Sequence, residues 1–524
     1  MKTIFRFFGF FFAQEIQKRI PTRRDRAALR PASINILGSG AGKNGQSFPL
    51  RNLGVFAPLR DFSCNDFILK RLVLLLVTYL LLPATFSIAG ESAGGDSCCA
   101  EGEEALDYPL DGYDRTGIAR LKAFKLVQEG KMRGTARLPW GAKLNESEIK
   151  LRLQGINENY DISATTPVEP VLQSGLREIL KNRDPHYSIA ILDITDPSQP
   201  RFAAVQADTL YPPGSIGKLL IMTGLFDQLA RVFPDPAARV RILKNTKITA
   251  DDFALRDTHE VPLYDQAANK ISYKIIKPGD TFNLWEWADH MVSPSANAAA
   301  SMVWKQVMLI DQFKTAYPVS KPQVEAYLKT TKKSLLSEQS VRVLRDPLGA
   351  VGLPEEEIRQ GTMFTGGGQR AVPGVSSYLT PKQMLRWMLK MEQGKLIDGW
   401  SSLEMKKLMY FTRRRYRYAS SPALDSAAVF FKSGSLYSCR PEPGFKCKKY
   451  MGNAKNFLNS VAIVESPAGS RNPCVYLVAL CSNVLKINSA VEHQTIATEI
   501  QEMILKHHGR FKPKKGKQAF VDPE

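Results

Sequence analysis

The chain has 524 residues, 44% of them hydrophobic and 23% charged, a composition typical of a globular protein and not of a collagen-like or disordered one. Its formal net charge is +20, but residues 1–60 hold eleven Lys and Arg against two acidic residues, and a second basic cluster lies at 506–517. Because much of the excess charge lies in the tails, and no zinc finger, basic zipper or RNA-binding aromatic motif is present, we expect no nucleic-acid partner.

The first features along the chain concern targeting. Residues 1–65 form a basic, weakly patterned extension, after which Lys70 and Arg71 precede an apolar run at 72–82 that ends in small residues. A positive segment, a short apolar core and a small-residue site are typical of a secretory signal. We therefore predict a signal peptide or signal-anchor at 66–89, membrane contact through it, and a periplasmic or otherwise extracytoplasmic protein. Its internal position indicates a gene start placed too far upstream or, alternatively, a cytoplasmic tail before an anchor.

The remaining chain divides by composition. A small, polar linker is predicted at 90–104, and a small accessory module of unassigned role at 105–168, with helical periodicity over 115–129. The main domain is predicted at 169–509, followed by a basic tail at 510–524.

The main domain begins and ends with strand patterns and is helical between them. Strands are predicted at 187–192, 201–205, 427–431, 459–465 and 474–482, and helices at 215–230, 284–303, 380–393 and 490–507. This order predicts an α/β (α+β) domain with one antiparallel sheet, whose first and last strands are adjacent and against which the central helices pack.

A first chemical motif lies at the start of the predicted helix at 215–230. Ser215 and Lys218 are three residues apart and therefore share one helical face. A serine alkoxide needs a nearby base, and a buried lysine whose pKa is lowered can serve. The preceding Pro-Pro-Gly indicates a tight turn that would bring Ser215 to the helix tip, whereas an exposed Ser–Lys pair would be chemically inert.

A second motif, Ser295-Ala296-Asn297, follows eighty residues later, and the stretches at 284–288 and 298–300 on either side of it predict a helix–loop–helix. The Ser295 hydroxyl could relay a proton to a leaving amine, and the Asn297 amide could hold a substrate carbonyl or Lys218. The alternative is a serine that caps a helix N-terminus.

A third motif, Lys432-Ser433-Gly434-Ser435, ends an apolar strand. Lys432 offers a positive charge for a substrate carboxylate, and Gly434 allows the close approach of backbone. The backbone N–H groups of Ser215 and Ser435 would then form an oxyanion hole. The alternative is a solvated lysine at a strand end.

The three motifs in this order resemble the S-x-x-K, S-D-N and K-T-G set of class A β-lactamases and penicillin-binding proteins. The resemblance covers 170–509 and implies a β-lactamase/transpeptidase-like fold, with a five-stranded antiparallel sheet flanked by helices and an all-helical subdomain. It implies an acyl-enzyme mechanism without a metal or cofactor. The implied catalytic residues are Ser215 as nucleophile, Lys218 as base and Ser295 as relay, and the implied substrate-binding residues are Asn297, Lys432, Ser433, Gly434 and Ser435.

The sequence departs from this family in two places. Ala296 replaces the usual acid of the second motif, which we expect to be tolerated. Class A β-lactamases also carry a Glu ahead of their Thr-Pro helix start, and the corresponding position before Pro381 is Phe364, with Glu355–Glu357 too early to substitute. Because that Glu activates the deacylating water, its absence predicts slow turnover or peptidase activity.

Three functional hypotheses remain at this point. The first is an exported β-lactam hydrolase, the second a D-alanyl-D-alanine carboxypeptidase acting on peptidoglycan stem peptides, and the third a penicillin-binding or scaffold protein without turnover. One of Arg413–Arg415 or Arg417 could also meet a substrate carboxylate, although a solvated basic loop is the simpler interpretation.

The seven cysteines leave the redox state open. Cys439 and Cys447 could close a short loop if the domain is exported, and Cys474 and Cys481 lie in or near the last strand. Buried free thiols are the equally weighted alternative. None of the cysteines has a histidine at zinc-ligand spacing.

Overall fold

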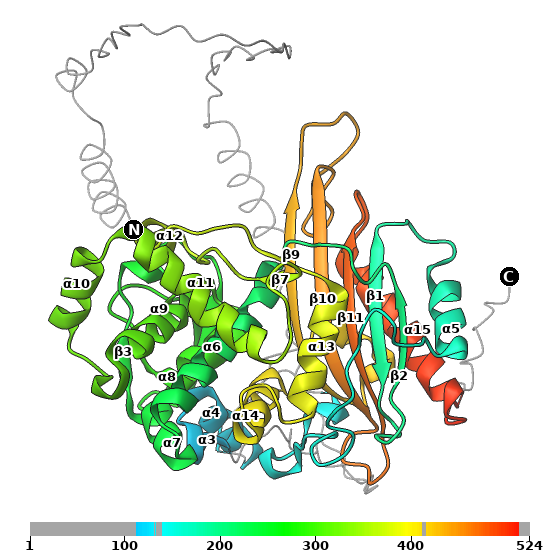
Figure 1. Ribbon diagram of the computed structural model, residues 1–524, viewed down its shortest axis with the longest axis horizontal. Coiled ribbons are helices and arrows are strands. Elements are labelled where there is room, and N and C mark those ends of the chain that lie inside the picture. Colours follow the sequence, from blue (N-terminus) through cyan, green and yellow to red (C-terminus); the bar gives the residue numbers. More distant parts are fainter. Residues whose placement is uncertain (1–111, 130, 133–138, 411–414, 513–524) are drawn as a thin grey trace, which may run out of the picture. The chain divides into compact units, whose positions relative to one another are not determined.

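The computed structural model describes residues 112–129, 131–132, 139–410 and 415–512 (Figure 1). The predicted extension, the signal or anchor at 66–89, the linker and most of the basic tail lie outside these residues, as do Cys64, Cys98 and Cys99. Within the described ranges, no helix is both long and apolar enough to cross a membrane.

A five-stranded antiparallel sheet forms the centre of the domain. Its strands are β1 (Tyr187–Asp193), β2 (Arg201–Val205), β9 (Ala428–Ser438), β10 (Lys455–Ser466) and β11 (Cys474–Asn483). The spatial order is β2-β1-β11-β10-β9, so the first strand pairs with the last, with Ala190 opposite Ala479. The predicted fold class and the adjacency of the terminal strands are therefore confirmed.

Helices cover both faces of the sheet (Figure 1). On one face, α5 (Pro170–Leu180) packs on β2 and α15 (Ser489–His507) packs on β10 and β11, and Ile189 and Ile191 of β1 join the buried cluster that these helices form. Ala190 and Leu192 point to the opposite face, as the two-residue period of a strand requires, and join the core there. All residues of β1 are buried, because a strand in the interior of a sheet that is covered on both faces has no exposed side.

On the second face of the sheet, α13 packs against β1 and β11, and the other central helices pack with it. The helices are α6 (Gly217–Val232), α7 (Pro236–Asn245), α8 (Leu284–Val292), α9 (Asn297–Phe313), α10 (Lys321–Thr330), α11 (Lys333–Ala350), α12 (Gly366–Ala371), α13 (Pro381–Glu392) and α14 (Gly399–Tyr410). Three short two-stranded sheets, which the sequence did not predict, connect them: β3 (Lys247–Thr249) with β6 (Thr281–Asn283), β4 (Glu260–Asp265) with β5 (Lys270–Ile275), and β7 (Ile358–Arg359) with β8 (Tyr378–Leu379).

The segment predicted to be helical over 284–303 is two helices, with the second motif in the loop between them, as the helix–loop–helix pattern around that motif predicts. It breaks between α8 and α9 at the second motif, where Ser295 has a left-handed φ of 64° that a helix cannot contain. Residues 380–393 instead form the single helix expected, with the Thr380 side chain capping α13 by accepting from the backbone N–H of Gln383.

The segment ahead of the main domain shares the domain's core. The periodicity over 115–129 predicts one helix, but α3 (Gly112–Thr116) and α4 (Ala119–Gln128) are separated at Gly117, whose φ is +70°. Leu121 joins the same buried cluster as α6 and α9, and the Arg120 guanidinium donates two hydrogen bonds to Asp289 of α8, at 2.7 and 2.8 Å.

Candidate active site

Ser215 lies in the turn that leads into α6. The turn is a short 3-10 helix, Gly214–Ile216, followed at once by α6, and its position is fixed from the sheet. The Asn459 side chain of β10 donates to the carbonyl of Pro212 at 2.8 Å. From β9, Gly434 approaches so closely that a Cβ there would lie 2.5 Å from the backbone nitrogen of Ser215. Only glycine permits this contact between the first and third motifs.

Lys218, the second residue of α6, is fully buried. Its Nζ lies 3.1 Å from the Oγ of Ser215, 2.6 Å from the carbonyl oxygen of Ser295 and 2.8 Å from the Oδ1 of Asn297. Burial lowers the pKa of Lys218 to about 7, against a smaller opposing effect of the Asp257 carboxylate. A large share of the Lys218 side chains is therefore neutral near pH 7.

Ser295 joins the two buried lysines of the site. Its left-handed backbone directs the hydroxyl between them, with Oγ 3.3 Å from the Nζ of Lys218 and 2.7 Å from the Nζ of Lys432. Burial lowers the pKa of Lys432 well below its usual value, and repulsion from Lys218 and Arg417 has a smaller effect in the same direction.

Asp257 fixes the start of α9, a role that sequence reasoning missed. Its Oδ2 accepts the backbone N–H of Ala298 at 2.8 Å, and its Oδ1 accepts from the ring of His259 at 2.7 Å. Burial alone would raise the pKa of Asp257, but the hydrogen bonds from His259 and Ala298 outweigh it and hold the pKa at about 2. The short Asp-Thr-His sequence carries no recognisable signal for this contact, which spans forty-one residues.

One arginine of the basic cluster reaches the third motif. Arg417 donates to the Oγ atoms of Ser433 and Ser435, at 2.8 and 3.0 Å, and to the hydroxyl of Tyr450 at 3.0 Å. Arg415 instead donates to the backbone carbonyls of Leu424 and Ala427. Arg413 and Arg414 lie outside the described residues.

Phe364, which stands at the sequence position of the deacylating Glu of class A β-lactamases, lies beside Lys218. The Nζ of Lys218 lies 4.9 Å from the centroid of the Phe364 ring, and the Oγ of Ser301 accepts the backbone N–H of Phe364. The whole connection 360–377 between β7 and β8 contains no Asp or Glu. The Glu355–Glu357 side chains lie before it, where Glu355 contacts Arg359 and Glu357 contacts Gln383.

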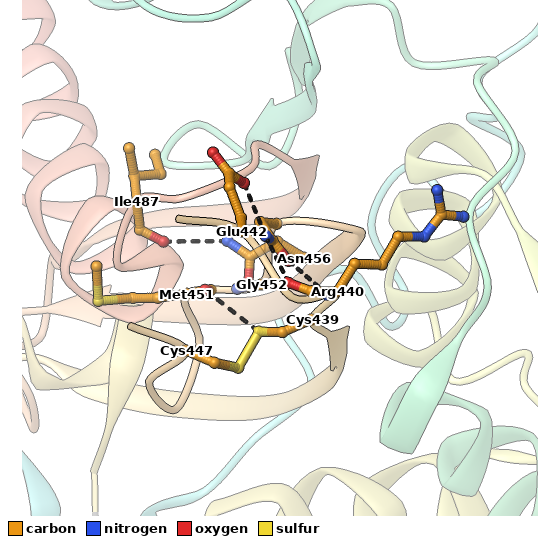
Figure 2. Close-up of a disulfide and its surroundings, with 9 residues drawn as sticks. Cys439, Arg440, Glu442, Cys447, Met451, Gly452, Asn456 and Ile487 are labelled. Atoms are coloured by element: carbon orange, nitrogen blue, oxygen red, sulfur yellow. Dashed lines mark hydrogen bonds between the residues drawn. A yellow bond between two sulfur atoms is a disulfide. The ribbon is translucent and has the colours of Figure 1, made fainter. Parts of the chain in front are cut away.

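Tyr450 lies in the loop between β9 and β10, shortly after the segment 439–447 that a disulfide closes; Figure 2 shows this disulfide. Cys439 and Cys447 form the disulfide, whereas Cys474 and Cys481 are free and buried. Of the two interpretations of the cysteines, a disulfide therefore holds for the first pair and buried free thiols for the second. The Asn456 side chain donates to the carbonyls of Val484 and Ile487 and thereby secures the base of the loop. The loop extends beyond the rest of the sheet (Figure 1).

All eight predicted site residues thus come together from three segments. Ser215, Lys218, Ser295 and Lys432 form one hydrogen-bonded array, Asn297 contacts Lys218, and Ser433 and Ser435 contact Arg417. Gly434 provides the close approach to Ser215. Asp257, Asn459, Phe364 and Tyr450 complete the surroundings of the site.

Several solved structures are similar to this chain at low sequence identity. The chain is similar to a variant of PBP-A in an acyl-enzyme complex with penicillin G (14% identity, 65% of this chain and 100% of that chain, TM-score 0.42). It is also similar to β-lactamases from Sphaerobacter thermophilus (14%, 65% and 99%, 0.42) and Chitinophaga pinensis (14%, 65% and 100%, 0.42). Among curated proteins, none matches the chain significantly. The model of the beta-lactamase enzyme family matches residues 171–507. The chain therefore belongs to the beta-lactamase enzyme family.

Proposed function

We propose that this chain is an exported serine hydrolase that forms an acyl-enzyme on Ser215 with β-lactams or related amides. The observation that carries the proposal is the contact between Ser215 and Lys218. The Oγ of Ser215 lies 3.1 Å from a buried amine whose pKa is lowered to about 7, so a base stands beside the nucleophile.

The hydrogen bonds of Lys218 orient it as that base. A neutral amine has two N–H donors and one lone pair. The carbonyl of Ser295 and the Oδ1 of Asn297 can only accept, so they take the two N–H groups and leave the lone pair for the hydroxyl of Ser215. As Oγ bonds to the substrate carbonyl carbon, its proton passes to Lys218, and the backbone N–H groups of Ser215 and Ser435 stabilise the oxyanion.

Ser295 then supplies the proton for the leaving nitrogen. Its hydroxyl lies between Lys218 and Lys432, so a proton taken up by Lys218 can pass through Ser295 to the nitrogen as the C–N bond breaks. Lys432, Ser433 and Arg417 form a cationic, hydroxyl-bearing subsite for the substrate carboxylate, and Asn297 binds the acylamide group.

Covalent labelling tests the proposal. The wild-type protein is expected to be labelled by a fluorescent penicillin, and Ser215→Ala is expected to abolish labelling, since no other atom replaces the lost Oγ. The exposed Ser198→Ala serves as the matched control and should label like the wild type. Undiminished labelling of Ser215→Ala would refute the assignment of the nucleophile.

Phe364 favours a second candidate for the physiological reaction, D-alanyl-D-alanine carboxypeptidase activity. Without a carboxylate at that position, the water that releases a penicilloyl group lacks its base, whereas a peptidase can still release its natural acyl group. Release of D-alanine from a muropeptide stem would support this candidate. Fast turnover of a chromogenic cephalosporin without D-alanine release would favour β-lactam hydrolysis, and labelling without any turnover would favour a binding protein.

Two features support export of the protein from the cytoplasm. The predicted signal at 66–89 supports it, and so does the disulfide between Cys439 and Cys447, because disulfides persist in oxidising compartments. Intact-mass spectrometry of the protein recovered from the extracytoplasmic fraction tests it. A mass that begins near residue 90, or the intact anchor in the membrane fraction, is expected, and a protein found only in the cytoplasm would contradict it.

A further inference from the structure

Asp193, His507 and His508 form a cluster on the side of the sheet away from Ser215. Asp193 is the last residue of β1, His507 ends α15, and His508 caps that helix. One carboxylate oxygen and one ring nitrogen from each histidine all lie within 4.8 Å of one another. The three residues therefore offer a convergent set of one oxygen and two nitrogen ligands.

The spacing of the cluster suits a tetrahedral ion. Two imidazoles that share a tetrahedral zinc, with bonds of about 2.0–2.1 Å, have ring centroids about 5 Å apart. The rings of His507 and His508 have centroids 5.1 Å apart. The Nε2 of His508 lies 2.6 Å from the Oδ2 of Asp193, and the three ligand atoms all lie within 4.8 Å of one another. The close pair therefore has to open by less than about 1 Å, and the other separations have to close by at most about 1.5 Å, to reach the roughly 3.3 Å that such bonds require.

The surroundings also favour a cation. Asp193 is only 1% exposed, and its Oδ1 is occupied by the backbone N–H of Thr195, which holds the carboxylate in place and leaves Oδ2 toward the histidines. Within the part of the chain that the structure describes, the His507 ring has no hydrogen-bond or ion-pair partner. The C-terminal end of α15 adds the negative end of the helix dipole.

We propose that Asp193, His507 and His508 bind a divalent zinc ion that fastens the end of α15 to β1. Two imidazoles and one carboxylate are ligands that zinc accepts, and both histidines are half-buried, so an ion can enter from solvent with water as the fourth ligand. The stabilised contact joins the last helix to the first strand, and their residues Ile496 and Ile191 belong to the same buried cluster.

The site is independent of the proposed catalytic function. Across the sheet, Gly434 lies opposite Asn459, Asn459 opposite Cys481, and Cys481 opposite Ser188, so the active site is level with the start of β1. Asp193 lies at the other end of that strand. Metal binding can therefore be measured without reference to acylation.

Zinc titration of the metal-stripped full chain tests the proposal. The wild type is expected to bind zinc at this site and to gain thermal stability, because a ligand that binds only the folded state raises the melting temperature. His507→Ala should weaken this binding by about tenfold or more and remove the gain, and it preserves the buried Asp193–His508 pair, so the fold is kept.

His186 provides the matched control. It is the exposed histidine beside a carboxylate, with Nδ1 2.7 Å from Asp184, and it lies outside the cluster. His186→Ala should bind zinc as the wild type does, and cobalt in place of zinc should give a visible spectrum that His507→Ala loses. Zinc binding and thermal stabilisation that are equal in wild type and His507→Ala, or absent from the wild type, would overturn the proposal.

Discussion

At the residue scale, burial decides what the lysines of the site can do. Lys218 and Lys432 share the hydroxyl of Ser295, and water is excluded from both ammonium groups. Desolvation disfavours the charged form of both lysines, and repulsion from Lys218 and Arg417 adds to it at Lys432, so the pKa of each lysine falls. The same residues on a solvated helix would remain protonated and could not accept a proton from Ser215.

The pH dependence of acylation follows from Lys218. Its pKa is lowered to about 7, and the neutral form is the base, so acylation by penicillin should accelerate as pH rises through 7 and level off above it. Well below the pKa, the rate constant should change about tenfold per pH unit. Stopped-flow measurement of acylation at several pH values checks this, and a rate that is constant on both sides of pH 7 would contradict it.

Phe364 should control the release of the acyl group. Phe364→Glu places a carboxylate beside Lys218 and is expected to raise the deacylation rate of the penicilloyl-enzyme by about tenfold or more, since general bases contribute at least that much. Time-resolved mass spectrometry of the acylated protein measures this rate. Phe364→Leu removes the ring without adding a carboxylate and should deacylate as slowly as the wild type. Equal rates in all three proteins would show that another step limits release.

At the element scale, the site depends on helices that are held at their ends. The second motif lies where α8 gives way to α9, so its position follows that of both helices. Asp257 holds the first turn of α9, and Arg120 of α4 holds Asp289 of α8. The segment ahead of the main domain thus supports the helix that leads into Ser295.

Loss of the Arg120–Asp289 pair should destabilise the domain. Both side chains are at most 1% exposed, so Arg120→Met leaves a buried carboxylate without its two donated hydrogen bonds. We expect the free energy of unfolding to fall by about 3–5 kcal/mol. Chemical denaturation measures the change, with the exposed Lys125→Met on the same helix as control, expected within about 0.5 kcal/mol of the wild type. A loss as small as that of the control would contradict the structural role of α4.

At the scale of the whole molecule, one sheet brings distant segments together. The turn before Ser215 is fixed by Asn459 of β10, Lys432 comes from β9, and the loop between these two strands returns through Tyr450 to Arg417. The disulfide between Cys439 and Cys447 restrains this loop next to the carboxylate subsite.

Opening the disulfide should weaken substrate binding more than chemistry. The double variant Cys439→Ser, Cys447→Ser should raise the penicillin concentration needed for half-maximal acylation rate, because the loop that carries Tyr450 is then less restrained and holds Arg417 less firmly, and leave the limiting rate near that of the wild type. The free energy of unfolding should fall by up to about 2–3 kcal/mol, as expected for a short closed loop. Reductant should produce the same change in the wild type and none in the double variant. If the acylation rate of the double variant depends on penicillin concentration as in the wild type, the loop does not contribute to substrate binding at the carboxylate subsite.

Much of this protein could be predicted from its sequence. The apolar, β-rich runs that form β1 and β11, the Thr380 cap and the order of strands and helices indicate an antiparallel sheet with its terminal strands adjacent, because these features act through neighbours in the chain. The three motifs identified the residues that meet at Ser215, since their spacing and order are distinctive.

Other features were decided only by the tertiary structure. Arg417, and not Arg415, contacts the third motif, Asp257 holds α9, and Asp193 meets the two histidines over more than three hundred residues. No local pattern encodes these contacts, because each depends on where separate elements pack. The pKa of Lys218 is of the same kind, since it is set by the water that folding excludes and not by the residues beside it in the chain.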